Sequence, residues 1–107
     1  MQLQDTTLDR NAELEAAAYY VYRLESPSRR WGIAVEHLIA DQFNVSVTYC
    51  EAGWDVHGVV RYWSFESRDL AEARYLELQR LLGEADEAAD MRAMLALLPP
   101  VERAEEA

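Results

Sequence analysis

The clearest pattern along the chain is an alternation of apolar and polar residues between positions 43 and 50. The apolar positions are Phe43, Val45, Val47 and Tyr49, and the residues between and after them are Asn44, Ser46, Thr48 and Cys50. Successive side chains of a strand point to opposite faces of its sheet, so this pattern predicts a strand with one face in the core.

Three other segments have weaker strand patterns, at residues 18–25, 31–40 and 59–65. For residues 8–24 and 31–40 a helical period also fits the apolar positions, so helix and strand both stay open there. We prefer a short helix at about 8–16 that runs into the strand at 18–25. The turn at Pro27 and the loop between Gly53 and Gly58 are short, and short connections predict antiparallel pairing of the four strands.

The best helical pattern runs from Ser67 to Leu82. Its apolar residues recur with helical spacing at Ala71, Tyr75, Leu78 and Leu82. They form a broad face that can cover one side of a sheet. Ser67 is the predicted N-cap, and Gly83 is the predicted glycine just beyond the last turn.

A further helix is predicted from Glu84 to Leu98, where Pro99 stops it. Its expected apolar stripe consists of Ala88, Met91, Leu95 and Leu98. Residues 1–5 are polar and are expected to fray, as chain ends do when nothing holds them.

The expected fold class is therefore α+β, with a mainly antiparallel sheet of about four strands covered on one face by the helix at 67–82 and followed by one more helix. A chain of 107 residues is expected to be a single domain. Its ordered core should cover about residues 6–98, and residues 99–107 should form an acidic tail.

Charge adds a constraint on function. The ten basic residues are all arginine, and they are outnumbered by twenty acidic residues, which gives a net charge of -10. Nucleic acid is normally bound by clustered basic residues, so this surface should repel it, and a charged partner is expected to be a basic protein. One cysteine, no signal peptide and no long apolar run predict a cytoplasmic protein that has no role at a membrane.

No motif points to catalysis, a cofactor or a metal. The residues His37, Cys50, Asp55 and His57 are of metal-ligand types, but the close pairs of ligands typical of zinc sites are absent. The four glycines are isolated, so there is no glycine-rich phosphate loop. We therefore expect a protein without enzymatic activity, and a small enzyme that uses Cys50 and His57 is the rival interpretation.

The acidic residues are the predicted partner-binding surface. Residues 84–107 hold seven acidic residues and two arginines, which accounts for half of the net charge. The acidic positions assigned to this surface are Asp69, Glu72, Glu77, Glu84, Glu87 and Asp90. The apolar contacts assigned to a partner are Trp54 and Leu76. An acidic surface can steer a basic partner, and it can also serve only to keep a small protein soluble.

A partial resemblance concerns Phe65, Glu66 and Ser67 before the Ala-rich helix. This ending resembles that of a WGR-type domain, a small module associated with nucleic-acid-dependent enzymes. Trp31 and Gly32 match two letters of the family signature, whereas Ile33 stands in place of its arginine. The motif also lies too far upstream of the helix. The resemblance implies a nucleic-acid-associated module, which is an alternative function and not an assignment.

The function expected from the sequence is a small acidic protein-binding module. Its narrower form is an inhibitor or decoy, of the kind made by phages or plasmids against host defence, that occupies the basic nucleic-acid-binding surface of a host protein. The alternative is a subunit of a homodimer or larger assembly with no inhibitory role. The sequence does not identify the partner, the oligomeric state or the pathway.

Overall fold

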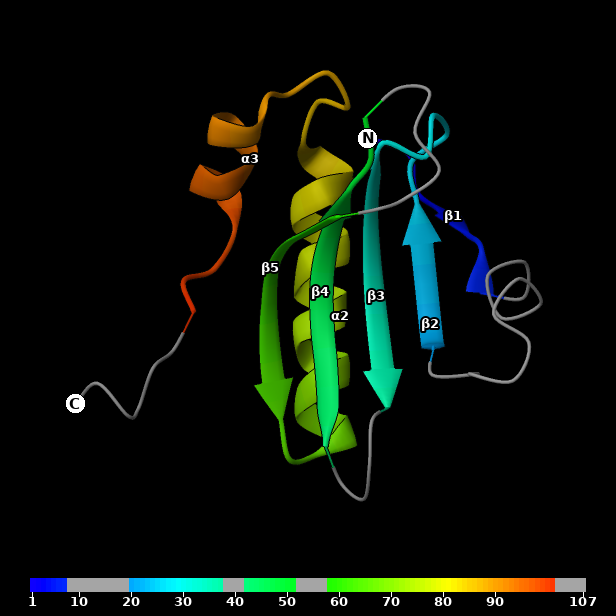
Figure 1. Cartoon of the computed structure of the whole chain (residues 1–107), viewed down its shortest axis with the longest axis vertical. Coiled ribbons are helices and arrows are strands. Elements are labelled where there is room, and N and C mark those ends of the chain that lie inside the picture. Colours follow the sequence, from blue (N-terminus) through cyan, green and yellow to red (C-terminus); the bar gives the residue numbers. More distant parts are fainter. Residues whose placement is uncertain (8–19, 38–41, 52–57, 102–107) are drawn as a thin grey trace.

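The computed structural model describes residues 1–7, 20–37, 42–51 and 58–101. Within these ranges, five antiparallel strands lie in chain order across one open sheet: β1 (Gln4–Asp5), β2 (Tyr20–Glu25), β3 (Trp31–His37), β4 (Phe43–Tyr49) and β5 (Gly58–Phe65). Helix α2 (Arg68–Glu84) lies behind the sheet in Figure 1, and α3 (Met91–Leu97) stands beside β5. This arrangement confirms the α+β class and the antiparallel sheet packed against a helix.

The core lies between α2 and one face of the sheet. On that face Val45 of β4 is paired with Val35 of β3 on one side and with Trp63 of β5 on the other. Val45 and Val35 are essentially unexposed, and Trp63 is buried as well. Phe43, Val45 and Val47 all belong to the core. The apolar positions of the alternating pattern at residues 43–50 are therefore those that face the core, as predicted.

Helix α2 begins as the sequence predicts. The Ser67 hydroxyl accepts a hydrogen bond from the Leu70 backbone N–H, and Ala71, Leu78 and Leu82 are fully buried. The role predicted for Gly83 is wrong, because this residue is inside the helix, which ends at Glu84. The physical reason is that the Met1 ammonium group donates to the carbonyl oxygens of Leu82, Gly83 and Ala85. A cation thus satisfies carbonyls that a left-handed glycine would otherwise help to pair.

Helix α3 is shorter than predicted, and its expected apolar stripe is correct only in part: Leu98 belongs to the core and Leu95 packs against it. It starts at Met91 because the Asp90 carboxylate accepts a hydrogen bond from the Ala93 N–H, which makes Asp90 its N-cap. Met94 is fully buried, although the predicted stripe omits it, whereas Met91 and Ala88 are exposed. Residues 85–90 therefore connect the two helices, and the predicted helix at 84–98 is correct only for its last half.

The first residues are ordered against the sheet, which corrects the expectation that they fray. Gln4 and Asp5 pair with Glu25 and Leu24 of β2, and the Thr6 N–H donates to the Arg23 carbonyl at 2.9 Å. Of the two segments whose type stayed open, residues 20–25 and 31–37 are strands. The helix preferred at 8–16, like residues 38–40, lies outside the described residues. None of the helices in the described ranges is both long and apolar enough to cross a membrane.

Candidate functional site

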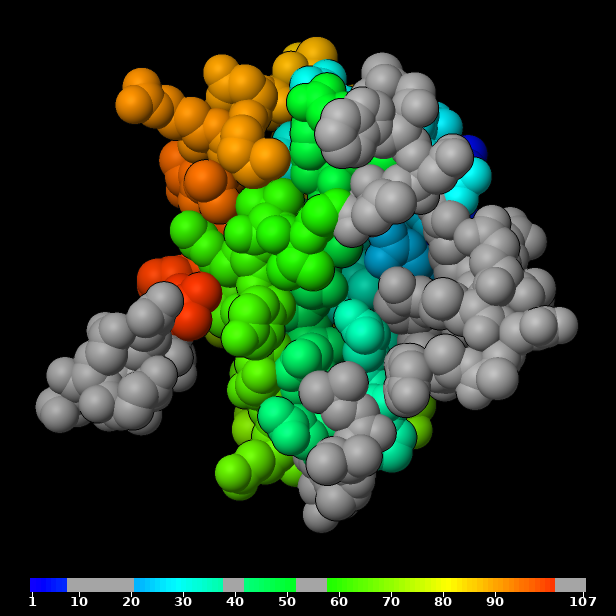
Figure 2. Space-filling model, in the orientation of Figure 1, coloured from blue at the N-terminus to red at the C-terminus, as the bar shows by residue number. Residues whose placement is uncertain are grey.

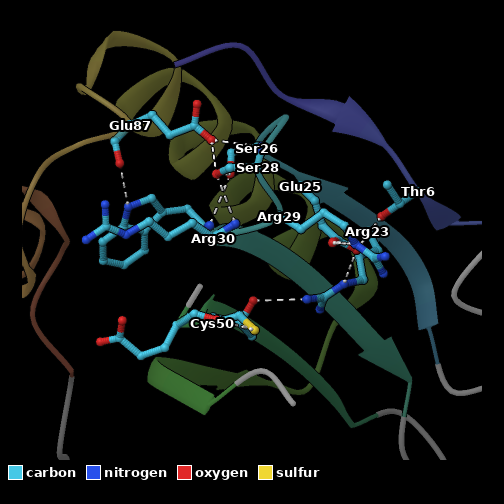
Figure 3. A network of polar contacts seen from close by, with 12 residues as sticks. Thr6, Arg23, Glu25, Ser26, Ser28, Arg29, Arg30, Cys50 and Glu87 are labelled. Carbon is cyan, nitrogen blue, oxygen red and sulfur yellow. Dashed lines mark hydrogen bonds and ion pairs between the residues drawn. The ribbon is translucent and has the colours of Figure 1, made fainter. Parts of the chain in front are cut away.

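The face of the sheet opposite α2 carries a buried ionic cluster. Arg23 and Glu25 alternate with the core residues of β2, so both project to this face, and their side chains pair at 3.1 Å with exposed fractions of 3% and 0%. Glu25 also pairs with Arg29 at 3.1 Å and accepts a hydrogen bond from the Thr6 hydroxyl at 2.8 Å. Figure 3 shows the Glu25 carboxylate surrounded by these groups. The cluster fixes the end of β2 and the turn that follows it.

The turn between β2 and β3 is shaped by Pro27 and Arg29. The Arg29 N–H donates to the Ser26 carbonyl, and Arg29 has a φ of 64°. A tight turn followed by one left-handed residue is a common way to close a hairpin. Left-handed backbone is unfavourable for a residue with a side chain. Its ion pair with Glu25 holds Arg29 in that conformation.

Glu87 attaches this turn to the segment between α2 and α3. Its carboxylate accepts hydrogen bonds from the Ser28 N–H at 3.1 Å and from the Ser28 hydroxyl, and its carbonyl accepts one from the Trp31 indole at 3.2 Å. The hydrogen bond from the Ser28 hydroxyl is the main reason why the pKa of Glu87 is lowered. Figure 3 shows Glu87 directly beside Ser28 and Ser26. Glu87, which the sequence assigns to a partner, is thus used inside the fold.

Four of the other predicted acidic residues also have partners within the chain. Glu72 accepts from the Tyr22 hydroxyl at 2.9 Å and from Arg68, Glu77 pairs with Arg74 at 3.0 Å, Glu84 lies 3.9 Å from Arg80, and Asp90 caps α3. Asp69 lies in the first turn of α2, where a negative charge complements the helix dipole. The structure therefore gives these acidic residues local roles, which leave open the binding role that the sequence predicts.

The other predicted residues are dispersed. Leu76 is 62% exposed on the outer side of α2, whereas Trp54 lies outside the described residues. Cys50 is buried just after β4, and the His37 ring stacks on Phe43 with 4.6 Å between centroids. His57 and Asp55 lie outside the described residues. Among those that are described, no three side chains of metal-ligand type come together.

A groove runs along β5, which is the edge strand of the sheet. Its volume is about 930 Å³. The lining comprises Val60, Arg61, Tyr62, Trp63, Ser64, Phe65, Arg74, Leu98, Pro100 and Val101. In Figure 2 the segment at residues 98–101, coloured red, stands next to the green side chains of β5. The groove is therefore bounded by the free edge of a strand and by the chain that follows α3.

Side chains of β5 hold this second wall in place. Arg61 donates to the carbonyl oxygens of Leu98 at 3.4 Å and Pro99 at 3.0 Å, and the Trp63 indole donates to that of Pro100 at 3.1 Å. Prolines lack a backbone N–H, so Pro99 and Pro100 cannot donate to a strand ladder. The segment is bound by its carbonyls, while no described strand pairs with the outer backbone edge of β5. Ordered contacts also reach past residue 98, where the core was expected to end.

Arg74 of α2 forms the floor of the groove. Its guanidinium lies over the rings of Trp63, at 5.0 Å, and Phe65, at 5.7 Å. Its Nε pairs with Glu77, but Nη1 is buried and has no hydrogen-bond partner among the described residues. A buried donor without an acceptor is unfavourable by about 1–3 kcal/mol. Arg74 therefore has capacity for one more acceptor.

Sequence reasoning did not identify this groove. Arg61, Trp63 and Arg74 match no motif, and Arg74 falls between the apolar positions of its helix. One signal was available, because strands that pair in chain order leave the last of them at an edge. Comparison with known proteins adds no relative, since no protein-family model, no curated protein and no solved structure matches the chain.

Proposed function

We propose that this protein is a non-catalytic protein-binding module that takes an extended segment of its partner as an additional strand along β5. The observation that carries the proposal is the edge strand Gly58–Phe65, whose outer side pairs with no strand in the described part of the chain and lies next to a groove of about 930 Å³. Peptides bind to such edges because main-chain hydrogen bonds supply affinity and neighbouring pockets supply specificity.

The composition of β5 supports this use of the edge. Natural sheets protect long edge strands with proline, inward-pointing charge, bulges or a covering segment. Strand β5 has no proline, and its exposed positions include Val59 and Tyr62, at 60% and 54%. It does contain one charged residue, Arg61, and its pairing with β4 is irregular at Val47 and Thr48. The segment nearest to it contains Pro99 and Pro100, which cannot donate backbone hydrogen bonds to it. An edge that is eight residues long and that no described strand covers is suited to a partner.

The net charge of -10 supports a second candidate function. A basic protein would be attracted by the overall field, and its association rate could rise by about ten- to a thousandfold at low salt. The inhibitor of a basic nucleic-acid-binding protein in the cytoplasm is the narrow form of this candidate. It differs from strand addition in that its affinity should fall steeply with salt.

The test of strand addition uses the full chain and extended peptides selected from a random display library. A selected peptide should then be synthesised with single N-methyl groups at each position in turn. Only every second amide of an added strand points toward β5, so methylation should abolish binding at alternate positions and be tolerated between them. Loss of binding at every position, or at none, would rule out strand addition.

Two alanine variants locate the site. Tyr62→Ala removes an exposed side chain that lines the groove and should weaken the peptide. Leu76→Ala removes an equally exposed side chain from the outer side of α2, outside the groove lining, and is the matched control. Equal effects of the two substitutions would place the peptide elsewhere.

A further inference from the structure

We infer that the segment bound along β5 is acidic, with an Asp or Glu side chain placed against Arg74. This inference rests on the proposed function, because it specifies the chemistry of the same groove. The partner would then be recognised by an extended stretch that alternates apolar side chains with at least one carboxylate, and Arg74 would be the residue that selects it.

The charge of the groove is opposite to that of the whole protein. Among the described residues that line it, two are charged, Arg61 and Arg74, and both are cationic. The chain as a whole has a net charge of -10, so a cationic groove is a local exception. A lysine or arginine side chain inserted beside these guanidinium groups would be repelled, whereas a carboxylate would be attracted. Charge complementarity thus favours an acidic segment.

The two arginines differ in their contacts. Arg61 uses Nη1 for the carbonyls of Leu98 and Pro99 and maintains the second wall. Arg74 uses Nε for Glu77, and its Nη1 lacks an acceptor among the described residues. The guanidinium is a planar fork whose two terminal nitrogens can hold a carboxylate with two parallel hydrogen bonds. Nη1 itself is covered, so an incoming carboxylate would contact the part of Arg74 that lines the groove.

The stacking of Arg74 makes it a rigid recognition element. Its guanidinium rests on the rings of Trp63 and Phe65, and its side chain is only 16% exposed. A side chain that is already immobilised loses less conformational entropy when it binds a ligand. Low exposure also removes competing water, which strengthens the interaction of the guanidinium with an anion.

The groove is bounded on its far side by the chain at Leu98 to Val101, which Arg61 and Trp63 hold next to β5. A second copy of the protein that paired its own β5 there would bring a whole sheet against this wall. A single extended segment would bring only one strand, so it is the occupant that we favour.

The experiment uses the peptide selected on the full chain, in three forms that differ at one position: Glu, Gln and Lys. Affinities are measured by calorimetry. We expect the Glu form to bind about ten- to a hundredfold more tightly than the Gln form, which is the range for a hydrogen bond to a charged group, and the Lys form to bind least. When the selected peptides are aligned, Asp or Glu should recur at the same position relative to the residues whose N-methylation abolishes binding.

Protein variants assign the effect to Arg74. Arg74→Met keeps an extended apolar side chain over the two rings and should make the Glu and Gln forms bind equally. Arg80→Met removes another arginine of α2, whose ion pair with Glu84 is exposed, and should leave the preference intact. Circular dichroism and thermal melts of both variants serve to check that each is folded. In a folded Arg74→Met variant, loss of the preference for the Glu form over the Gln form then reports on the guanidinium.

The outcomes separate the two proposals. Peptides that bind with alternating N-methyl sensitivity but without preference for Glu would overturn the inference about Arg74 and leave strand addition in place. Peptides without that alternation would overturn both. A concentration-dependent dimer that excludes the peptide would make a second copy the occupant, and binding of single-stranded oligonucleotide in the groove would favour the WGR-like alternative; either result contradicts the acidic segment.

Discussion

Arg23 and Glu25 form an ion pair two residues apart on the same face of β2, with 3.1 Å between Nε and Oε2, and water reaches neither side chain to a significant extent. Residues at this spacing share a face of the strand, so the pair needs no distant element to bring it together. Arg29 and Thr6 bind the same carboxylate from the turn and from the N-terminal segment. Glu25 therefore joins three parts of the chain.

The first prediction concerns this carboxylate. Glu25→Ala removes the carboxylate that pairs with the buried Arg23, and removal of one member of a buried ion pair is expected to lower the free energy of unfolding by about 3–5 kcal/mol. Urea denaturation measures this loss. Glu84→Ala is the matched control, because its pair with Arg80 is exposed at 73% and 61% and should contribute less than about 1 kcal/mol. Equal losses in the two variants would contradict the structural role of Glu25.

The second prediction compares two glycines. A Cβ atom on Gly32 would lie 2.7 Å from the Thr48 hydroxyl and 3.1 Å from Arg23 Nη2, which are themselves hydrogen-bonded at 3.0 Å. Gly32→Ala should therefore destabilise the protein by about 1–3 kcal/mol through overpacking. Gly83→Ala meets open space within α2 and should stabilise it by about 0.5–1 kcal/mol. In thermal melts, Gly32→Ala should lower the melting temperature and Gly83→Ala should raise it.

The third prediction tests the packing of α2. Leu78 is completely buried, so Leu78→Ala should lower the free energy of unfolding by about 2–5 kcal/mol. Leu76 is 62% exposed on the same helix, and Leu76→Ala should change stability by less than about 0.5 kcal/mol. A loss below about 1 kcal/mol for Leu78→Ala in urea would contradict the core position of this face.

The fourth prediction concerns alkaline pH. Burial is the main cause that raises the pKa of Tyr75 to about 12, with further contributions from Asp5 and Tyr22. A phenol ionises near pH 10 when unfolded, so the unfolded chain releases this proton first as the pH rises. The contribution of Tyr75 to stability should be complete below pH 10 and be lost progressively up to about 12.

Tyr75→Phe should make the free energy of unfolding less dependent on pH in that window. Denaturation curves at several alkaline pH values provide the measurement, and ultraviolet absorbance follows the phenolate directly. Wild-type and variant curves with the same pH dependence would contradict the raised pKa of Tyr75.

The elements predicted correctly are those whose own residues determine them. Strand β4 alternates because one of its faces lies in the core, and α2 has both a side-chain cap at Ser67 and a regular apolar face. The errors arise where distant residues decide. Gly83 stays helical because the Met1 ammonium group binds the end of α2, and β1 exists because Gln4 and Asp5 pair with a strand about twenty residues away.

The candidate groove was not predictable for the same reason. Arg61 and Trp63 acquire their function from carbonyls at Leu98 to Pro100, 37 or 38 residues further along the chain. Arg74 looks like an ordinary charged position until its stacking on Trp63 is seen. The acidic residues assigned to a partner show a related limit of the sequence. A count of charges does not reveal which acidic side chains already have partners within the chain.

The two ends of the sheet are unequal, since β1 contributes two residues and β5 contributes eight. An assembly that grows by adding strands needs a long donor edge at each end of every unit. Within the described residues this protein has one such edge, so it can accept one added strand. Any complex formed along β5 would stop after a single addition, which favours a discrete pair over a fibre even though the edge itself carries no proline to protect it.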